Sequence, residues 1–528
     1  MSKPVESFFD LPAPGFDLWT FPDKPLSIDM TDIIFQAPMY KFSENNMKFK
    51  QRYFVLTQDY LFYLHSEEVP TIVAYMPTQW VRVDYLPNFK TTPFGTYHCF
   101  RFVRNMKFVD LFCDNDVHFN EWKENLARVF IQCDFHTKFN TIKMIGKGSF
   151  ARVYLIENKK TKKMFAVKAF SKEYLLSQPK GRESLMNEIE VMQKLKHPYI
   201  MNLEEIHESK NSVYLVVELL EGGELLHYIS NKDSLSTVDF YQVMKCILEA
   251  LAYMAEKNIM HRDLKPDNMI LKERNKLHQC TLKIVDFGLS TVCDIPEYLF
   301  KRCGTPGYVA PEVINAPSNV NIHYGPKCDV FSVGVIFYIM LTQRSPFDGK
   351  SFKEILQKNK NCHIDFDHYR LQSNASARDL LIRMLDKNPE TRVSAKDALK
   401  HPFFTEIEEA RAPIEKKTFD HGELTNFQSI FRKKHQNENQ NDANSFVMRD
   451  RDILGNLNSV CNSANSNGAI LSLKSMASPV TKANPQAHKG GYSLLKNVLI
   501  NNSEQMAGTL YDGKFNKQLF ESDCEFDC

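Results

Sequence analysis

Six short polar clusters, spread in a fixed order between residues 146 and 312, constrain this 528-residue chain more than any other feature. The glycines of the first cluster lie between two apolar runs, where a hairpin turn can bring backbone amides close to phosphate groups. Lys168 ends a strand-like run and Glu188 lies in a helical apolar pattern, so the two side chains can pair across neighbouring elements. In chain order, the clusters are GKGSFARV (146–153), FAVK (165–168), LMNEIEVMQKL around Glu188, HRDLKPDN (261–268), DFG (286–288) and APE (310–312).

These clusters, taken together and in this order, resemble the eukaryotic protein kinases over residues 139–404. The resemblance implies an α+β bilobal fold that transfers a phosphoryl group from ATP, a reaction that depends on positioning and charge neutralisation. It assigns Asp263 to the proton of the attacking hydroxyl and Lys265 to the charge on the transferred group. It assigns Asn268, which also belongs to the catalytic loop, and Asp286 to Mg²⁺, because both offer hard oxygen ligands.

The same resemblance implies a nucleotide site. Lys168, anchored by Glu188, would contact the phosphates, and Ala166 and Ile270 would enclose the adenine ring. Ala151 replaces the third glycine of the usual pattern, which would loosen the approach to the phosphates without removing the site. The residues assigned to ATP are Gly146, Lys147, Gly148, Val153, Ala166, Lys168, Glu188, Glu218, Leu220, Glu224 and Ile270.

The HRDLKPDN cluster is similar to that of serine/threonine kinases, because tyrosine kinases usually carry HRDLAARN. The segments LDKNPETRVSAKDALKHPFF and GTPGYVAPE look most like the calcium/calmodulin-dependent group, and Arg392 resembles an arginine that pairs with Glu312. The chain has no D-x-D-x-D-G loop, so we do not expect it to bind calcium through an EF-hand. The implied partners are proteins with serine or threonine acceptors.

Lys301 occupies the place where many members of this family carry a threonine that is phosphorylated for activation. A lysine cannot take a phosphate there. The activation loop, which runs between the DFG and APE clusters, must therefore be ordered in another way. We expect Asp294 or Glu297 to offer Arg262 a fixed carboxylate, and regulation to come from parts of the chain outside the loop.

The sequence pattern of residues 33–134 predicts a second domain. Runs rich in β-branched and aromatic residues alternate with turns and indicate an all-β unit. An apolar stripe at helical spacing then follows, formed by Phe119, Trp122, Leu126 and Val129. The runs KQRYFVL and LFY, with Trp122 in the closing helix, resemble a pleckstrin homology domain, which implies a small barrel with a C-terminal helix. Because about five residues join this unit to the first kinase strand, we expect the domains to pack directly, so that lipid binding could relieve an inhibitory contact.

Four cations of this domain, Lys41, Lys48, Lys50 and Arg52, cluster around the first hairpin. In the pleckstrin homology family, cations at the mouth of this hairpin hold inositol phosphates by charge-assisted hydrogen bonds. The alternative is that charged residues at alternate strand positions simply face water. Both interpretations, a phosphoinositide membrane bound through residues 41–52 and a solvated strand, remain open.

The remaining segments carry weaker patterns. Residues 1–32 have no periodicity and are expected either to be disordered or to dock as an N-terminal arm. Four apolar residues between 424 and 431 precede RKKH, which predicts a basic helix within residues 405–435, either a calmodulin or autoinhibitory segment or an ordinary helix packed on the catalytic lobe. Residues 436–528 are rich in asparagine and are expected to form a largely disordered tail.

The composition of the chain limits its possible partners and its location. The net charge of +2 gives no global attraction to nucleic acid, and no apolar run is long enough to span a bilayer. The twelve cysteines form no C-x-x-C pair, which favours free thiols and a cytoplasmic location, with peripheral membrane association through the hairpin. Two non-catalytic alternatives stay open: a pseudokinase scaffold and a lipid-recruited adaptor.

Overall fold

The computed structural model describes residues 6–10, 17–43, 48–69, 71–92, 95–148, 150–230, 237–273, 281–293, 295, 298–316 and 324–405. The chain divides into two units, Met1–Thr405 and Glu406–Cys528, and all described residues lie in the first. The segments expected to hold a regulatory helix and a disordered tail, apart from Thr405, therefore lie outside the described residues.

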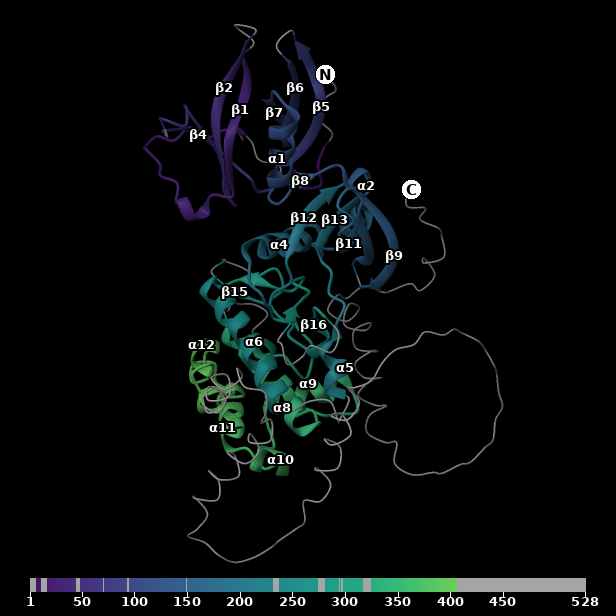
Figure 1. Ribbon diagram of the computed structural model, residues 1–528. Helices are drawn as coiled ribbons and strands as arrows, with labels where there is room; N and C mark the ends of the chain where they lie inside the picture. Colours follow the sequence, from purple (N-terminus) through teal and green to yellow (C-terminus); the bar gives the residue numbers. More distant parts are fainter. Residues whose placement is uncertain are drawn as a thin grey trace, which may run out of the picture. The chain divides into compact units, whose positions relative to one another are not determined.

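The N-terminal β domain is an antiparallel arrangement of strands followed by one helix (Figure 1). Its strands pair in the order β4-β3-β2-β1-β7-β6-β5. This agrees with the all-β unit and closing helix predicted from the sequence, whereas a closed pleckstrin homology barrel stays a prediction. The elements are β1 (Phe35–Ser43), β2 (Lys48–Leu56), β3 (Tyr60–Leu64), β4 (Ile72–Pro77), β5 (Arg82–Thr92), β6 (Gly95–Arg104), β7 (Lys107–Cys113) and α1 (Asp116–Leu126).

Helix α1 closes the core of this domain. It begins where the Asn115 side chain accepts a hydrogen bond from the His118 amide, which satisfies one of the free donors of the first turn. Trp122 is fully buried and meets the ring of Phe35 edge-on at 4.8 Å between centroids. The first three residues of the predicted apolar stripe therefore form the face that packs on the strands. Val129, the fourth, is buried but lies beyond the end of the helix at Leu126.

Of the two alternatives for the N-terminal segment, the contacts of residues 6–10 and 17–32 agree with docking and not with disorder. Phe8 and Phe9 are buried, Thr20 forms a β-bridge with Tyr75, and a short 3₁₀ helix, η1 (Met30–Asp32), precedes β1. No periodic pattern in the sequence signals these contacts, because each depends on a residue far away along the chain.

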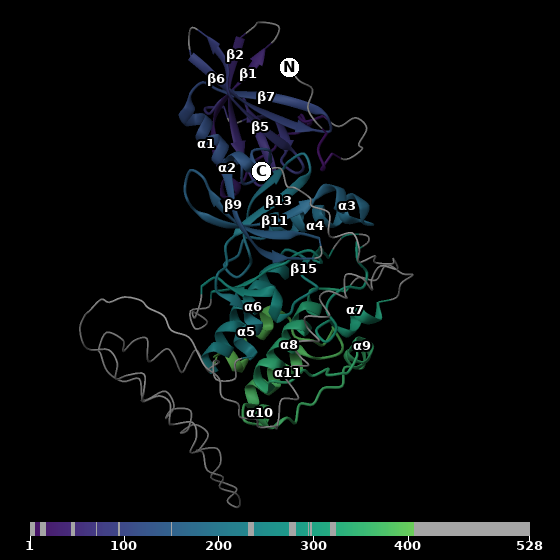
Figure 2. The ribbon, with the colours of Figure 1, turned by 90° about the vertical axis from the view of Figure 1, so that its right-hand side faces the viewer.

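The first part of the catalytic region is rich in strands, and we call residues 139–218 the small lobe. Strand β8 lies between β5 and β12 and pairs with both in parallel, so one sheet continues from the N-terminal β domain into the small lobe. Helix α4 lies beside β11–β13 in both views (Figures 1 and 2). The joint and the small lobe contain β8 (Ile131–Gln132), α2 (Phe135–Lys138), β9 (Phe139–Lys147), β10 (Arg152–Asn158), β11 (Met164–Ser171), α3 (Lys172–Ser177), α4 (Gly181–Lys194), β12 (Leu203–Glu208) and β13 (Ser212–Glu218).

Residues 223–405, the large lobe, are mostly helical. Helix α8 is buried over nearly its whole length, which suits its almost continuous apolar sequence, and α6 lies beside it (Figure 2). The elements are β14 (Gly223–Glu224), α5 (Leu225–Ser230), α6 (Thr237–Glu256), β15 (Ile259–Met260), η2 (Pro266–Asn268), β16 (Met269–Leu271), β17 (Leu282–Ile284), β18 (Thr291–Val292), α7 (Pro311–Asn315), α8 (Lys327–Thr342), α9 (Phe352–Asn361), α10 (Tyr369–Gln372), α11 (Ala375–Met384) and α12 (Ala395–Ala398).

Two expectations from composition can be compared with these elements. Seven of the described cysteines carry free thiols, but Cys246 on α6 is disulfide-bonded, so the expectation of free thiols is wrong for that residue. Within the described part of the chain, every helix is too short or too polar to traverse a bilayer.

Candidate active site

The glycine turn connects β9 to β10. Gly146 pairs with Val153 across the two strands, and the Gly148 amide donates to the Ala151 carbonyl at 2.8 Å, which closes the turn. Lys147, the last residue of β9, is exposed. The predicted phosphate-side residues therefore gather in one hairpin.

A cluster of three charged side chains joins strand β11, helix α4 and the DFG segment. It consists of Lys168, Glu188 and Asp286. Lys168 Nζ lies 2.8 Å from Glu188 Oε1 and 3.0 Å from Asp286 Oδ1, so the predicted pair is present and the lysine also reaches the DFG aspartate. Lys168 lowers the pKa of Asp286 to about 2, although burial opposes this shift. Burial would lower the pKa of Lys168, but Asp286 and Glu188 outweigh it and raise that pKa, so Lys168 and Asp286 are both charged at neutral pH.

The adenine-side residues come from both lobes. Ala166 lies in β11, paired with Val217 of β13, and Ile270 of β16 pairs with Glu224 of β14. The carboxylate of Glu218 already contacts Lys283 Nζ at 2.6 Å.

The Glu218 side chain is therefore engaged within the protein, and the assignment of Glu218 to ATP stays a prediction. Leu220, two residues further along the loop that follows β13, is half-buried. Burial and the neighbouring Asp267 raise the pKa of the Glu224 carboxyl.

Asp263 is held by a network of three side chains. Its Oδ1 accepts a hydrogen bond from Thr305 Oγ1 at 2.6 Å, and its Oδ2 accepts from Asn268 Nδ2 at 3.2 Å. Lys265 Nζ lies 3.2 Å from Oδ2 and donates to Thr305 Oγ1 at 3.1 Å. Burial would lower the pKa of Lys265, but Asp263 outweighs it and raises the pKa. The three residues assigned to catalysis thus lie within one hydrogen-bonded cluster.

The backbone beneath this cluster is fixed by the first residue of the segment DVFSVG (329–334). Asp329, at the start of α8, accepts hydrogen bonds from the amides of His261 at 2.7 Å and Arg262 at 2.8 Å. Arg262 and Asp286 both adopt left-handed backbone angles, with φ of 68° and 65°. Such angles are costly for side chains other than glycine, so they need fixed partners of this kind.

Arg262 is bound through its Nε and Nη1 atoms by groups of the described protein. Its guanidinium donates to the carbonyls of Leu289 and Phe300, both at 2.7 Å, and to the hydroxyl of Tyr324 at 3.0 Å. The guanidinium also lies over the ring of Tyr298 at 5.4 Å.

The two tyrosines are themselves interlocked. The Tyr324 hydroxyl donates to the Lys301 carbonyl, and the Tyr298 hydroxyl to the Tyr324 carbonyl. Asp294 and Glu297, the carboxylates expected to meet Arg262, lie outside the described residues. A buried tyrosine pair and backbone carbonyls occupy the surroundings of Arg262.

A second predicted ion pair stabilises the large lobe. Arg392 donates to both carboxylate oxygens of Glu312, at 2.6 and 2.9 Å, and its side chain is fully buried. This bidentate geometry is the strongest form of such a pair.

The four cations of the N-terminal hairpin share one face. Strand register opposes Lys41 to Lys50 and Met39 to Arg52, so these cations lie on the side of the hairpin that carries the buried Met39. Lys48 lies two residues before Lys50 on β2, so its side chain points to the same side. The ammonium of Lys41 lies over the rings of Trp19 and Tyr63, and Arg52 Nε donates to the Tyr63 hydroxyl.

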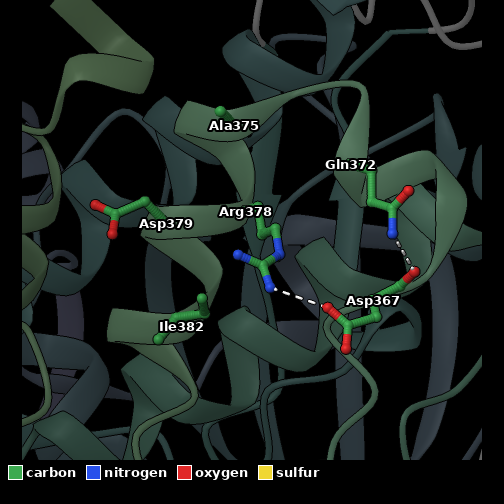
Figure 3. Close-up of a pocket in the computed structure, with 6 residues that line it drawn as sticks. All are labelled: Asp367, Gln372, Ala375, Arg378, Asp379 and Ile382. Carbon is green, nitrogen blue, oxygen red and sulfur yellow. Dashed lines mark hydrogen bonds and ion pairs between the residues drawn. The ribbon is translucent and has the colours of Figure 1, made fainter. Parts of the chain in front are cut away.

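A cavity of about 360 Å³ lies elsewhere, in the large lobe (Figure 3). Arg378 points to the carboxylate of Asp367 at 3.1 Å, and the side-chain amide of Gln372 donates to the Asp367 carbonyl. All lining residues lie between 367 and 382, and none belongs to the predicted nucleotide or catalytic set.

The donor set fits Mg²⁺ and ATP. Asn268 uses its amide nitrogen to hold Asp263, which leaves its oxygen as a ligand, and the Asp286 carboxylate is 53% exposed. In the described residues no group of three or more His, Cys, Asp or Glu side chains could hold a metal by itself. Mg²⁺ usually takes one or two protein oxygens and the remainder from phosphates and water, and Asn268 and Asp286 offer oxygens of this kind.

Comparison with known proteins gives the family. Residues 139–404 match the model of the protein kinase domain. The chain belongs to the protein kinase family. Over 264 residues it is 38% identical to a "Probable serine/threonine-protein kinase 2" of Plasmodium falciparum, covering 50% of this chain and 49% of that protein.

Two further relatives indicate the type of kinase. Over 270 residues, the chain is 37% identical to "Calcium-dependent protein kinase 4" of Plasmodium berghei, covering 51% of this chain and 50% of that protein. It is also 37% identical over 265 residues to a "Probable myosin light chain kinase" of Dictyostelium discoideum, covering 50% and 82%. The chain spans about half the length of the Plasmodium relatives. Residues 139–404 thus form a domain homologous to serine/threonine protein kinases.

Proposed function

We propose that this protein transfers the γ-phosphate of ATP to serine or threonine hydroxyls of other proteins. The observation that supports this most is the arrangement of Asp263, Lys265 and Thr305 beside the Lys168–Glu188–Asp286 cluster. Homology to serine/threonine kinases supports the choice of acceptor.

The chemistry assigned to each side chain is simple. Asp263, oriented by Thr305 through Oδ1 and by Asn268 through Oδ2, aligns the acceptor hydroxyl and takes its proton as the new oxygen–phosphorus bond forms. The bond between the γ-phosphorus and the bridging oxygen breaks, and the electron pair leaves with ADP. Lys265 neutralises charge on the transferred group, and Lys168 holds the phosphates in line. Mg²⁺, held by Asp286 and Asn268, would supply further charge neutralisation when bound.

The test is a transfer assay with purified full-length protein, Mg²⁺, ATP labelled in the γ position and a library of serine, threonine and tyrosine peptides. We expect incorporation on serine and threonine, and its loss in Asp286→Ala and Asp263→Asn. Equal incorporation by the wild type and Asp286→Ala would contradict catalysis and favour the pseudokinase or adaptor alternative.

Membrane recruitment through the N-terminal β domain is a second candidate function. We propose a cytoplasmic enzyme that meets phosphoinositide headgroups through the shared face of Lys41, Lys48, Lys50 and Arg52. No carboxylate of the described residues forms an ion pair with these four cations, which leaves their charge available to an anion.

Vesicle sedimentation tests this recruitment. Lys50→Ala combined with Arg52→Ala should reduce binding to phosphoinositide-containing vesicles, and Lys107→Ala, on β7 and paired with Asp17, is the matched control. Equal binding by both variants would favour the solvated-strand interpretation.

We also propose that calcium regulates this kinase. The proposal rests on a relative whose name, "Calcium-dependent protein kinase 4", states such a dependence for that protein. The segment expected to bind calmodulin, residues 424–435, lies outside the described residues. Adding calcium–calmodulin to the transfer assay tests this directly: unchanged rates would remove calmodulin from the partners.

A further inference from the structure

Residues 6–10, which we call the arm, form a tight turn buried against the catalytic region. The Asp10 amide donates to the Ser7 carbonyl at 3.1 Å, and the Ser7 amide donates to Asp10 Oδ2 at 2.9 Å. Phe8 is 7% exposed and Phe9 is fully buried. Two adjacent phenylalanines in a turn that fixes its own backbone are suited to fill an apolar groove.

Helix α4 forms one wall of the groove that they fill. Phe8 and Phe9 belong to one buried apolar cluster with Leu185, Met186 and Ile189 of that helix. Phe9 stacks on Trp80 of the N-terminal β domain, with centroids 5.3 Å apart and planes at 5°. Aromatic stacking and full burial of such rings are among the larger contributions to an interface.

Charged groups fix the arm in place. The buried Glu208 carboxylate accepts hydrogen bonds from Ser7 Oγ and from the Phe8 amide, both at 2.6 Å. Lys172 contacts the same carboxylate at 2.6 Å, so the charge of Glu208 is compensated. In the described chain, the arm thus supplies two of the donors to a carboxylate about 200 residues away.

Helix α4 itself is contacted by a second set of polar groups. The guanidinium of Arg182, in the first turn of α4, lies over the Phe8 ring at 5.6 Å and donates to the Asp10 carbonyl. Asp10 Oδ1 also accepts from the Asn105 amide of the N-terminal β domain at 2.6 Å. The arm therefore connects the start of α4 to a separate domain.

Glu188 lies about two turns further along this helix. We propose that the arm is a built-in clamp, in which Phe8, Phe9 and Ser7 hold α4 so that Glu188 keeps Lys168 in the position used for phosphoryl transfer. The proposal rests on the kinase function above. Ser7, Phe8 and Phe9 would be positioning residues, since they act through Glu188.

The state of the site favours support by the arm over inhibition. With the arm docked, Lys168 Nζ lies 2.8 Å from Glu188 Oε1, and the Glu188 side chain is only 7% exposed. Within the described chain, the arm's hydrogen bonds and ring contacts involve none of the residues assigned to ATP or to catalysis. An inhibitory segment would be expected to separate this pair or to cover the nucleotide site.

The experiment uses the full chain. Phe9→Ala empties the groove, and Ser7→Asp places a second carboxylate beside Glu208. We expect each to lower kcat by about 5- to 150-fold, the range typical of coupling between two sites in one protein. Phe21→Ala is the matched control, because Phe21 is an aromatic residue near the arm in sequence that is 68% exposed, and it should leave kcat unchanged.

A peptide added in trans separates positioning from general destabilisation. A synthetic peptide of residues 1–16 should restore kcat of the Phe9→Ala protein in a saturable manner, and the same peptide carrying Phe9→Ala should not. Thermal melting of each variant is followed in parallel.

Each outcome bears on the proposal. An unchanged kcat in Phe9→Ala would overturn it, and a raised kcat would show the inhibitory contact predicted from the sequence instead. Reduced activity without rescue by the native peptide would also count against a clamp. If the wild type is as inactive as Asp286→Ala, the proposed function fails, which is a different result from failure of the clamp.

Discussion

Replacing Tyr324 with phenylalanine tests whether the activation loop around Lys301 is ordered without phosphate. The change removes one oxygen atom and keeps the buried ring. It takes from Arg262 Nη1 its 3.0 Å acceptor and from the Lys301 carbonyl its donor. Arg262 already has a buried Nη2 without a hydrogen-bond partner, so the guanidinium has little capacity to lose another bond.

The expected magnitude follows from the charge of the donor. A hydrogen bond to a charged group contributes about 1.5–3 kcal/mol, which corresponds to a shift of about 10- to 150-fold in the equilibrium between ordered and open segments. We expect kcat/KM for a peptide substrate to fall, with an upper limit set by this factor, and amide hydrogen exchange to rise across residues 298–309.

Two controls make the result decisive. Tyr369→Phe changes an exposed tyrosine of the same lobe and should behave like the wild type. Phosphatase treatment of the wild type should leave kcat/KM unchanged, because the surroundings of Arg262 need no phosphate. If Tyr324→Phe keeps wild-type activity and exchange, the tyrosine hydroxyl does not order the segment, and if phosphatase abolishes activity, a phosphate is required after all.

Three further predictions concern the same domain. Because the pKa of Asp286 is lowered to about 2, its ion pair should stabilise the folded state fully above about pH 4 and lose this effect as the pH falls through 2, so melting curves of the wild type and Asp286→Asn should converge only in strong acid. Glu312→Ala leaves the buried Arg392 without its carboxylate and should lower the free energy of unfolding by about 3–5 kcal/mol in denaturant titrations, while Lys400→Ala, at an exposed pair, should change it by less than about 1 kcal/mol. Thr305→Ala removes the 2.6 Å bond to Asp263 and should reduce kcat by about tenfold or more with little change in KM for ATP, as measured by steady-state kinetics, whereas a proportional rise in KM would indicate a binding role.

The sequence predicted most of the site and little of what supports it. Lys168, Glu188, Asp263 and Asp286 were predictable because the chemistry requires particular residue types within short motifs, and local spacing places each motif on one element. The contact that Asp329 makes was not predictable, since it fixes the Arg262 amide from 67 residues away.

The tyrosines around Arg262 were missed for a similar reason. Nothing near Tyr324 in the sequence indicates that its hydroxyl faces a residue 62 positions earlier. The arm shows the same limit: SFFD has no periodicity, and its partner Glu208 becomes visible only when β12 is placed.

The β domain was predictable as a class but not in its connection. Alternating apolar residues indicated the strands and Trp122 the closing helix, because both follow from which face is buried. The two residues of β8 are too short for any periodicity, so the continuous sheet could not be anticipated.

That two-residue strand has a consequence for anyone who wishes to isolate the catalytic part. A protein cut before Phe139 loses Ile131 and Gln132, which pair with Ile206 and His207 of β12. The backbone groups of β12 would then face solvent at an open edge of the sheet, and such open edges invite pairing with other chains. Aggregation of the shortened protein would thus result from the loss of β8 from the sheet. It would not mean that the catalytic residues are inactive.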